Sequence, residues 1–93
     1  MSNTKKKAKR AAHAAMVWER DQLQIALAAE KIDKAMAVVE QYGDELTEEQ
    51  KAEIVAVAQQ RSEDVRAFAM KARDKYIAKM ADLGLEPTFT KEA

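Results

Sequence analysis

Only three residues in this 93-residue chain are strong helix breakers, and they fall at two places. Gly43 lies near the middle of the chain, and Gly84 and Pro87 lie near its carboxyl end. Nineteen alanines fill much of the rest, and alanine is the best helix former. No useful stretch alternates apolar and polar residues as a half-buried strand would. The sequence therefore predicts an all-α protein made of long helices.

The first interruption predicts a turn at residues 43–47. A helical pattern ends at Tyr42, and Gly43 follows it in the position where glycine commonly adopts the left-handed conformation. Thr47-Glu48-Glu49-Gln50 then forms a capping box, in which the side chains of the first and last residues satisfy each other's backbone amides. A turn this short makes the two flanking helices antiparallel neighbours.

The second interruption predicts the end of the second helix. Gly84 and Leu85 fit the two positions after a helix that form a Schellman motif, and Pro87 follows where no helix continues. We therefore expect a basic flexible arm at residues 1–7, a helical hairpin at 8–85 and a tail at 86–93, with Phe89 as the tail's one anchor. Within the hairpin we expect helices from near Ala8 to Tyr42 and from about Glu48 to Leu83, each roughly 50 Å long.

Apolar residues spaced by three and four predict the seam between the two helices. The stripe comprises Trp18, Ile25, Ala28, Ile32, Ala35, Val39 and Tyr42 in the first helix, and Ile54, Ala58, Val65, Phe68, Ala72, Tyr76 and Leu83 in the second, interrupted by Arg61. Folding about residues 44–46 pairs Ile25 with Val65, Ile32 with Ala58 and Trp18 with Ala72.

A second apolar set remains outside the seam: Met16, Leu23, Leu27, Met70 and Ile77. A lone helix pair has no third layer to cover it, and monomers seldom expose large apolar patches. The tail could fold back over this set, or the first helix could break to give a three-helix bundle. We favour self-association into a coiled-coil-like bundle of four or more helices, because a small alanine-rich hairpin has little core of its own.

The net charge is zero, with 16 basic and 16 acidic residues, but the charges are segregated. The open end of the hairpin is basic through Lys5, Lys6, Lys7, Lys9 and Arg10, and through Arg66, Arg73 and Lys75 of the second helix. The turn is acidic through Glu40, Asp44, Glu45, Glu48, Glu49 and Glu53. The basic residues are candidate nucleic-acid contacts, with a solvated arm as the alternative. The acidic residues either complement the helix dipole or dock on a basic partner.

The residues for catalysis or metal binding are missing from the sequence. There is no cysteine and one histidine, His13, which lies among alanines. Both glycines are at helix ends, so no phosphate-binding loop exists. We therefore expect no enzyme, no metal and no cofactor. The absence of cysteine, of a signal-peptide pattern and of a long apolar run favours a cytoplasmic protein with no membrane association.

These features predict a non-enzymatic protein–protein interaction module that binds itself and a further protein. No motif identifies a family. In size and style the chain resembles the small accessory proteins of bacteria and their viruses, including regulators and inhibitors that occupy another protein's surface. A nucleic-acid-binding accessory protein is the alternative, and a small-ligand site between subunits is a third possibility.

Overall fold

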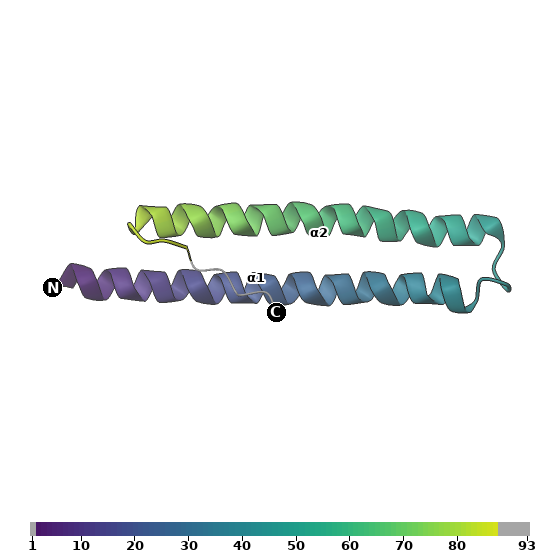
Figure 1. The fold of residues 1–93 in the computed structure, drawn as a ribbon, viewed down its shortest axis with the longest axis horizontal. Helices are drawn as coiled ribbons and strands as arrows, with labels where there is room; N and C mark the ends of the chain where they lie inside the picture. Colours follow the sequence, from purple (N-terminus) through teal and green to yellow (C-terminus); the bar gives the residue numbers. More distant parts are fainter. Residues whose placement is uncertain (1, 88–93) are drawn as a thin grey trace.

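The computed structural model describes residues 2–87, with side chains from Thr4 onward. Helix α1 spans Ser2–Gln41 and helix α2 spans Glu48–Asp82, and no strand occurs between residues 2 and 87. The two helices run antiparallel, side by side, and form a rod of 67 × 20 × 18 Å (Figure 1). The expected all-α hairpin is therefore confirmed. Most of the expected tail, including Phe89, lies outside the described residues.

Helix α1 begins at Ser2 rather than near Ala8. No glycine or proline precedes Gly43, so nothing in the sequence interrupts the helix between these points. Residues Lys5 to Arg10 are helical and exposed in consequence. The flexibility expected for residues 1–7 stays a prediction.

The turn lies where it was expected, but Gly43 does not have the expected left-handed backbone. Among the described residues only Gly84 has a positive φ. After Gln41 the chain continues with tight turns, in which the amides of Glu45 and Leu46 both donate to the Tyr42 carbonyl, at 3.0 and 3.1 Å. A Cβ atom at residue 43 would lie 2.9 Å from the Val39 carbonyl oxygen. Glycine is needed at residue 43 for this close approach.

The start of α2 has the predicted capping box. The Gln50 amide donates to the Thr47 hydroxyl at 3.1 Å, and the Thr47 amide donates to the Gln50 side-chain oxygen at 2.9 Å. Two of the amides that a helix start leaves unpaired are thus satisfied. Helix α2 therefore begins at Glu48, as the sequence predicted.

The end of α2 has the predicted Schellman motif. Gly84 has a φ of 70°, its amide donates to the Ala81 carbonyl at 2.9 Å, and the Leu85 amide donates to the Met80 carbonyl at 2.9 Å. These two bonds satisfy carbonyls that the helix end would leave free. Helix α2 ends at Asp82, with Leu83 as its cap, one residue before the expected end.

The seam residues on α1 repeat with alternating spacings of four and three, as in a coiled coil. Trp18 is buried, and the predicted seam residues Ile25, Ala28, Ile32, Ala35 and Val39 are half-buried. Tyr42, predicted to extend the stripe, is 45% exposed because it lies in the turn, beyond the helix.

On α2 the seam differs from the prediction along one edge. Ala58, Ala72 and Tyr76 are buried as expected, but Phe68 is 39% exposed and Ala69 is half-buried in its place. Similarly, Ser62 is half-buried and the neighbouring Arg61 is exposed, so the charge does not interrupt the seam. Small side chains at these positions let the helix backbones approach closely.

The alignment of the two helices agrees with the prediction at two of its three pairs, since Trp18 and Ala72 belong to one buried cluster. Trp18 stacks on Tyr76, with ring centroids 4.9 Å apart and planes inclined by 17°, rather than lying against Ala72 alone. Ile32 shares a surface cavity with Ser62 and Val65, and its predicted pairing with Ala58 stays a prediction. Ile25 and Val65 do line one cavity together, as the predicted alignment required.

Candidate interaction surfaces

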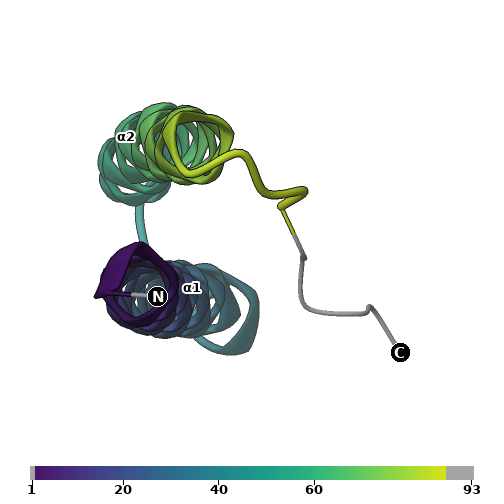
Figure 2. The ribbon, with the colours of Figure 1, turned by 90° about the vertical axis from the view of Figure 1, so that its left-hand side faces the viewer.

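Four of the five residues predicted to form an interface are well exposed. Met16 is 70% exposed, Leu23 61%, Leu27 49% and Met70 62%, whereas Ile77 is half-buried. Viewed along the rod, the described residues form one layer of α1 and one of α2, with no third helix over either (Figure 2). No break in α1 folds a third helix back over these side chains, so they stay uncovered within residues 2–87.

The structure does not bring these residues together into one patch. Met16 lies about 200° around α1 from the seam residue Trp18, and Met70 lies about 200° around α2 from the seam residue Ala72. Both side chains therefore point away from the opposite helix, on the two outer sides of the rod. The hairpin has an apolar area on α1, made by Met16, Leu23 and Leu27, and a separate one around Met70.

Further apolar side chains are exposed that the sequence analysis did not single out. Val57 is 56% exposed, and Met36 and Val38 are also largely open to solvent. None of them belongs to the two apolar sets that were predicted from the sequence. Exposed apolar surface therefore extends into the half of the rod nearer the turn.

A buried acid lies in the seam at the open half of the hairpin. Asp21 is 3% exposed, and it occupies the heptad position between Trp18 and Ile25. Lys75 Nζ lies 3.3 Å from its Oδ2, and Arg20 Nη2 lies 3.5 Å from its Oδ1. Both cations remain mostly exposed. Asp21 was not predicted as a seam residue because it is charged, although the spacing of the apolar stripe passes through this position.

A surface groove of about 610 Å³ runs beside the stacked pair of Trp18 and Tyr76. Its lining combines seam residues with charged side chains, all of which are exposed apart from the buried Asp21. The charged or ionisable lining residues are His13, Arg20, Asp21, Lys75, Lys79 and Asp82. Volumes of this size are typical of small-molecule sites, but the groove is open along one side of a helix pair and does not enclose a ligand.

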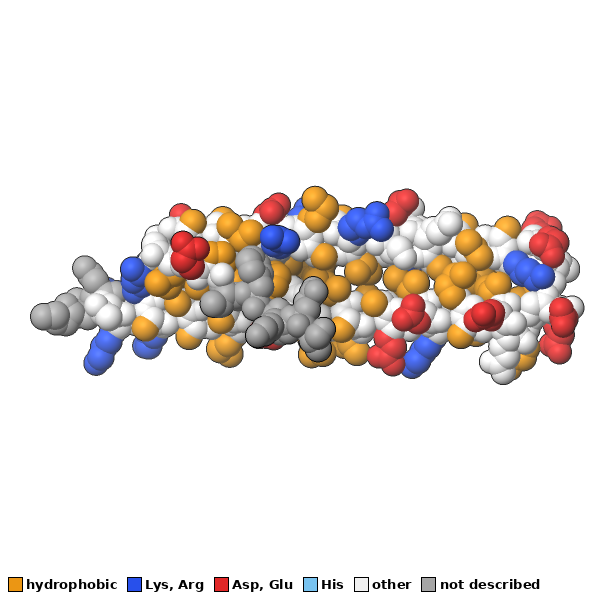
Figure 3. All heavy atoms as spheres, in the orientation of Figure 1, with side chains coloured by type: hydrophobic (Ala, Val, Ile, Leu, Met, Phe, Trp, Pro, Cys, Tyr) orange, Lys and Arg blue, Asp and Glu red, His pale blue; other side chains and the backbone are white. Residues whose placement is uncertain are grey.

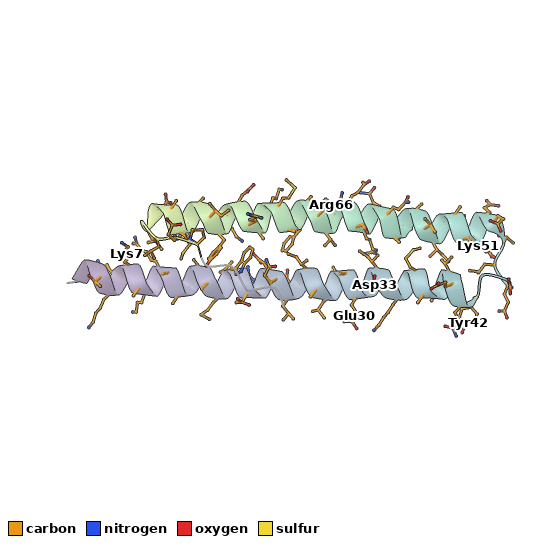
Figure 4. The ribbon with its side chains drawn as sticks, in the orientation of Figure 1. Lys7, Glu30, Asp33, Tyr42, Lys51 and Arg66 are labelled. Atoms are coloured by element: carbon orange, nitrogen blue, oxygen red, sulfur yellow. The ribbon has the colours of Figure 1, made fainter. Side chains whose placement is uncertain are left out.

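The basic residues proposed as nucleic-acid contacts fall into separate groups. Lys6, Lys7 and Arg10 surround a hollow of about 400 Å³ together with Asp82 and Leu83 at the end of α2. Lys7 projects toward this end of α2 (Figure 4), where a cation also complements the helix dipole. The structure thus brings part of the basic amino-terminal stretch against α2.

The basic residues of α2 do not extend this group into one surface. Lys75 is held in the ion pair with Asp21. Arg66 lines a different hollow, beside Asp33 of α1. Arg73 lies seven residues after Arg66 and so on the same side of α2, away from the side of Lys75. The described residues therefore show no continuous basic stripe along the rod.

The acidic residues predicted at the turn do gather at one end of the molecule. Glu40, Asp44, Glu45, Glu48, Glu49 and Glu53 are all exposed. Figure 3 shows acidic side chains clustered at the turn end, with basic side chains at the opposite end of the rod. Lys51 lies among them and pairs with Glu48 at 3.2 Å. The rod therefore carries opposite charge at its two ends.

Within the described residues, no three or more His, Cys, Asp or Glu side chains come together as a metal site. Over the same residues, neither helix has an apolar stretch long enough to cross a membrane. The arrangement offers two helices with charged ends and exposed apolar side chains. Such surfaces favour association with another macromolecule.

No protein-family model matches this chain, and neither the search of curated proteins nor the search of solved structures gives a match.

Proposed function

We propose that this chain is a non-enzymatic helical interaction protein, which self-associates through the outward apolar side chains of α1 and presents its remaining surface to a protein partner. The observation that carries this proposal is the amount of surface that the single chain leaves exposed. On the outer side of α1 this exposed surface includes the large apolar side chains of Met16, Leu23 and Leu27.

The single chain exposes 7667 Å² for a mass of 10.4 kDa. A compact monomer of this mass exposes about 5,400 Å². The excess is therefore roughly 2,300 Å² per chain, whereas a stable interface buries about 1,200–2,000 Å² over both partners. The radius of gyration, 19.1 Å, also exceeds the value of about 12 Å expected for a compact domain of this length. Association with a second helical surface supplies the missing burial.

The composition of the seam supports the same conclusion. Three of the buried residues are alanines, Ala14, Ala58 and Ala72, and none of the side chains described, from Thr4 to Pro87, is less than 2% exposed. Small side chains bury little apolar area, so the hairpin's own core contributes little stabilising free energy. Association would stabilise the folded chain by mass action, since only the folded form presents the interface.

Sedimentation velocity tests the proposal directly. We expect the unmodified chain to shift from monomer to dimer or larger assembly as its concentration rises from micromolar to several hundred micromolar. We also expect its thermal midpoint to rise over the same range, because folding and association are linked. A single monomeric species with a constant thermal midpoint over this range would contradict the proposal.

A nucleic-acid-binding role remains the second candidate, and the exposed helical cations from Lys5 to Arg10 favour it. Phosphate contacts release counterions, so binding would weaken steeply with salt, with a log–log slope of several units. Deletion of residues 1–10 would abolish nucleic-acid binding and leave binding to a protein partner largely intact. Titrating a fluorescent duplex and a single strand at two salt concentrations separates the two functions.

A further inference from the structure

A second line of residues with coiled-coil spacing runs along α1, on the side opposite the seam. It takes every fourth and then every third residue from Lys9 to Gln41, and each of its members is exposed. The apolar residues Met16, Leu23 and Leu27 lie in its middle. Glu30, on the same line, points away from α2 (Figure 4). This spacing keeps one side of a helix facing a partner helix over its whole length.

From this line we infer, on the basis of the proposed self-association, that the partner is a second copy of the chain, paired antiparallel along the outer side of α1. The twofold axis crosses the outer side of α1 at the level of residue 25, so that Leu23 of each copy faces Leu27 of the other. This places the two leucines of the line in the centre of the interface, where the twofold axis generates two Leu23–Leu27 contacts. In an antiparallel coiled coil each a position of one helix faces a d position of the other, and Leu23 and Leu27 occupy two such positions.

The charges on either side of this centre are complementary in the same alignment. Arg20 of each copy faces Glu30 of the other, which forms an oppositely charged layer on both sides of the leucines. Within its own chain Arg20 lies 3.5 Å from Asp21 and Glu30 lies 3.3 Å from Lys34, and the layer adds to these two ion pairs. Met16 faces Lys34, whose aliphatic stem can cover an apolar side chain while its ammonium group reaches water. Charge complementarity of this kind selects the orientation and alignment of a helix pair.

The ends of the rod extend the same pattern. Lys6 of one copy lies near the turn of the other, which carries Asp44, so the basic open end of each hairpin meets the acidic turn of its partner. The two ends of the rod carry opposite charge (Figure 3), so the antiparallel dimer places a basic end beside an acidic end at both of its ends.

The competing alignments place like charges or mismatched side chains together. In a parallel dimer each residue of the line faces its own copy, so Arg20 meets Arg20, Glu30 meets Glu30 and Lys34 meets Lys34. Sliding the antiparallel pair by seven residues one way brings Lys9 against Lys34. Sliding it the other way sets Leu27 against Glu30 and Leu23 against Lys34. Like charges that face each other across an interface disfavour the pairing.

A distance measurement tests the orientation with substitutions only at the ends of the interface, far from Leu23 and Leu27. The chain has no cysteine, so Asp44→Cys provides a single site for a spin label at the turn. In the antiparallel dimer the two turns lie at opposite ends of the interface, and the two Gln41 residues alone are separated by 32 residues of rise, or about 48 Å along the axis. In a parallel dimer the two labels lie within roughly 25 Å, about two helix diameters. A mixture of Lys6→Cys and Asp44→Cys chains should instead give a short distance between the unlike labels.

Charge exchange tests the alignment. Glu30→Lys places two cations opposite each other in the layer on either side of the leucines. We expect this to raise the dissociation constant of the dimer about tenfold. Arg20→Glu should weaken the dimer similarly, and the exchange variant R20E/E30R should restore its affinity to within about threefold. Circular dichroism of each variant checks that the hairpin still folds. The control is the same change of charge on the other helix: Glu63→Lys on α2 should leave the affinity of the dimer unchanged.

The outcomes separate this inference from the proposed function. A chain that stays monomeric at every concentration overturns both. A dimer with a short distance between its two labelled turns overturns the antiparallel pairing and leaves self-association standing. A dimer with the long distance in which R20E/E30R is no tighter than either single variant overturns the alignment at Leu23 and Leu27. The long distance together with rescue supports the inference in full.

Discussion

Lys75 Nζ lies 3.3 Å from Oδ2 of Asp21, a carboxylate whose side chain is 4% exposed, in the seam between α1 and α2. Removing a charge from water costs free energy that only a well-placed partner offsets. Lys75 reaches Asp21 only when the helices are aligned as they are here, with Trp18 on Tyr76. The ion pair therefore disfavours other alignments of the hairpin, in the way that a single polar residue fixes the alignment of a coiled coil.

Lys75→Ala should lower the free energy of unfolding by about 1–2 kcal/mol, because it leaves the Asp21 carboxylate buried with only Arg20 near it. Adding Asp21→Leu to this variant should recover the loss or exceed it, since the leucine fills a seam position without a charge. Urea unfolding monitored by circular dichroism measures both. Lys71→Ala, at an exposed position of the same helix, is the control and should change stability by less than about 0.5 kcal/mol. Equal stabilities for the Lys75 and Lys71 variants would contradict this account.

Trp18 and Tyr76 should be energetically coupled. Their rings stack across the seam with centroids 4.9 Å apart, and both side chains are buried. Each single substitution to leucine should destabilise the fold by about 1–3 kcal/mol. A double-mutant cycle should give a coupling of about 0.5–1.5 kcal/mol. Additivity within about 0.3 kcal/mol would show that the stacking contributes nothing beyond the burial of each ring.

The two glycines should respond differently to substitution. Gly84→Ala should cost about 1 kcal/mol, since φ is 70° there, and Gly84→Asn should cost less because asparagine tolerates this conformation. Gly43 has no positive φ, and its constraint is the Val39 carbonyl 2.9 Å from a Cβ position. Asparagine should therefore be no better than alanine at residue 43. Thermal unfolding of the four variants measures this, and a clear advantage for Gly43→Asn over Gly43→Ala would contradict it.

The helix ends of α2 were predictable because their signals are local. Thr47 and Gln50 bond to each other across three residues, and Gly84 adopts its conformation through bonds to the preceding turn. The start of α1 was less predictable. Lysines near a helix start oppose its dipole, which suggested fraying, yet the helix begins at Ser2 because no glycine or proline interrupts residues 2–41. At this end, a local electrostatic penalty of a few tenths of a kcal/mol did not decide the structure.

The seam could be predicted on α1 but only in part on α2, for a physical reason. Hydrophobicity favours Phe68 as a seam residue, but close approach of two helices favours the neighbouring Ala69. Small residues in a seam cannot be recognised from hydrophobicity, because alanine occurs on every side of these helices. Asp21 was missed for a related reason, since its partner Lys75 lies on the other helix and the pairing depends on the alignment.

The most direct test of the outward face as an interface is sedimentation of Leu23→Asp beside the unmodified chain. Leu23 lies outside the seam, so we expect the variant to keep its helix content while sedimenting as a monomer at concentrations where the unmodified chain associates. Val57→Asp, a similarly exposed apolar position on α2, should associate like the unmodified chain, and Val65→Asp, in the seam, should unfold. A folded Leu23→Asp chain that associates as strongly as the unmodified protein would contradict the claim that the outer side of α1 is covered by a second copy.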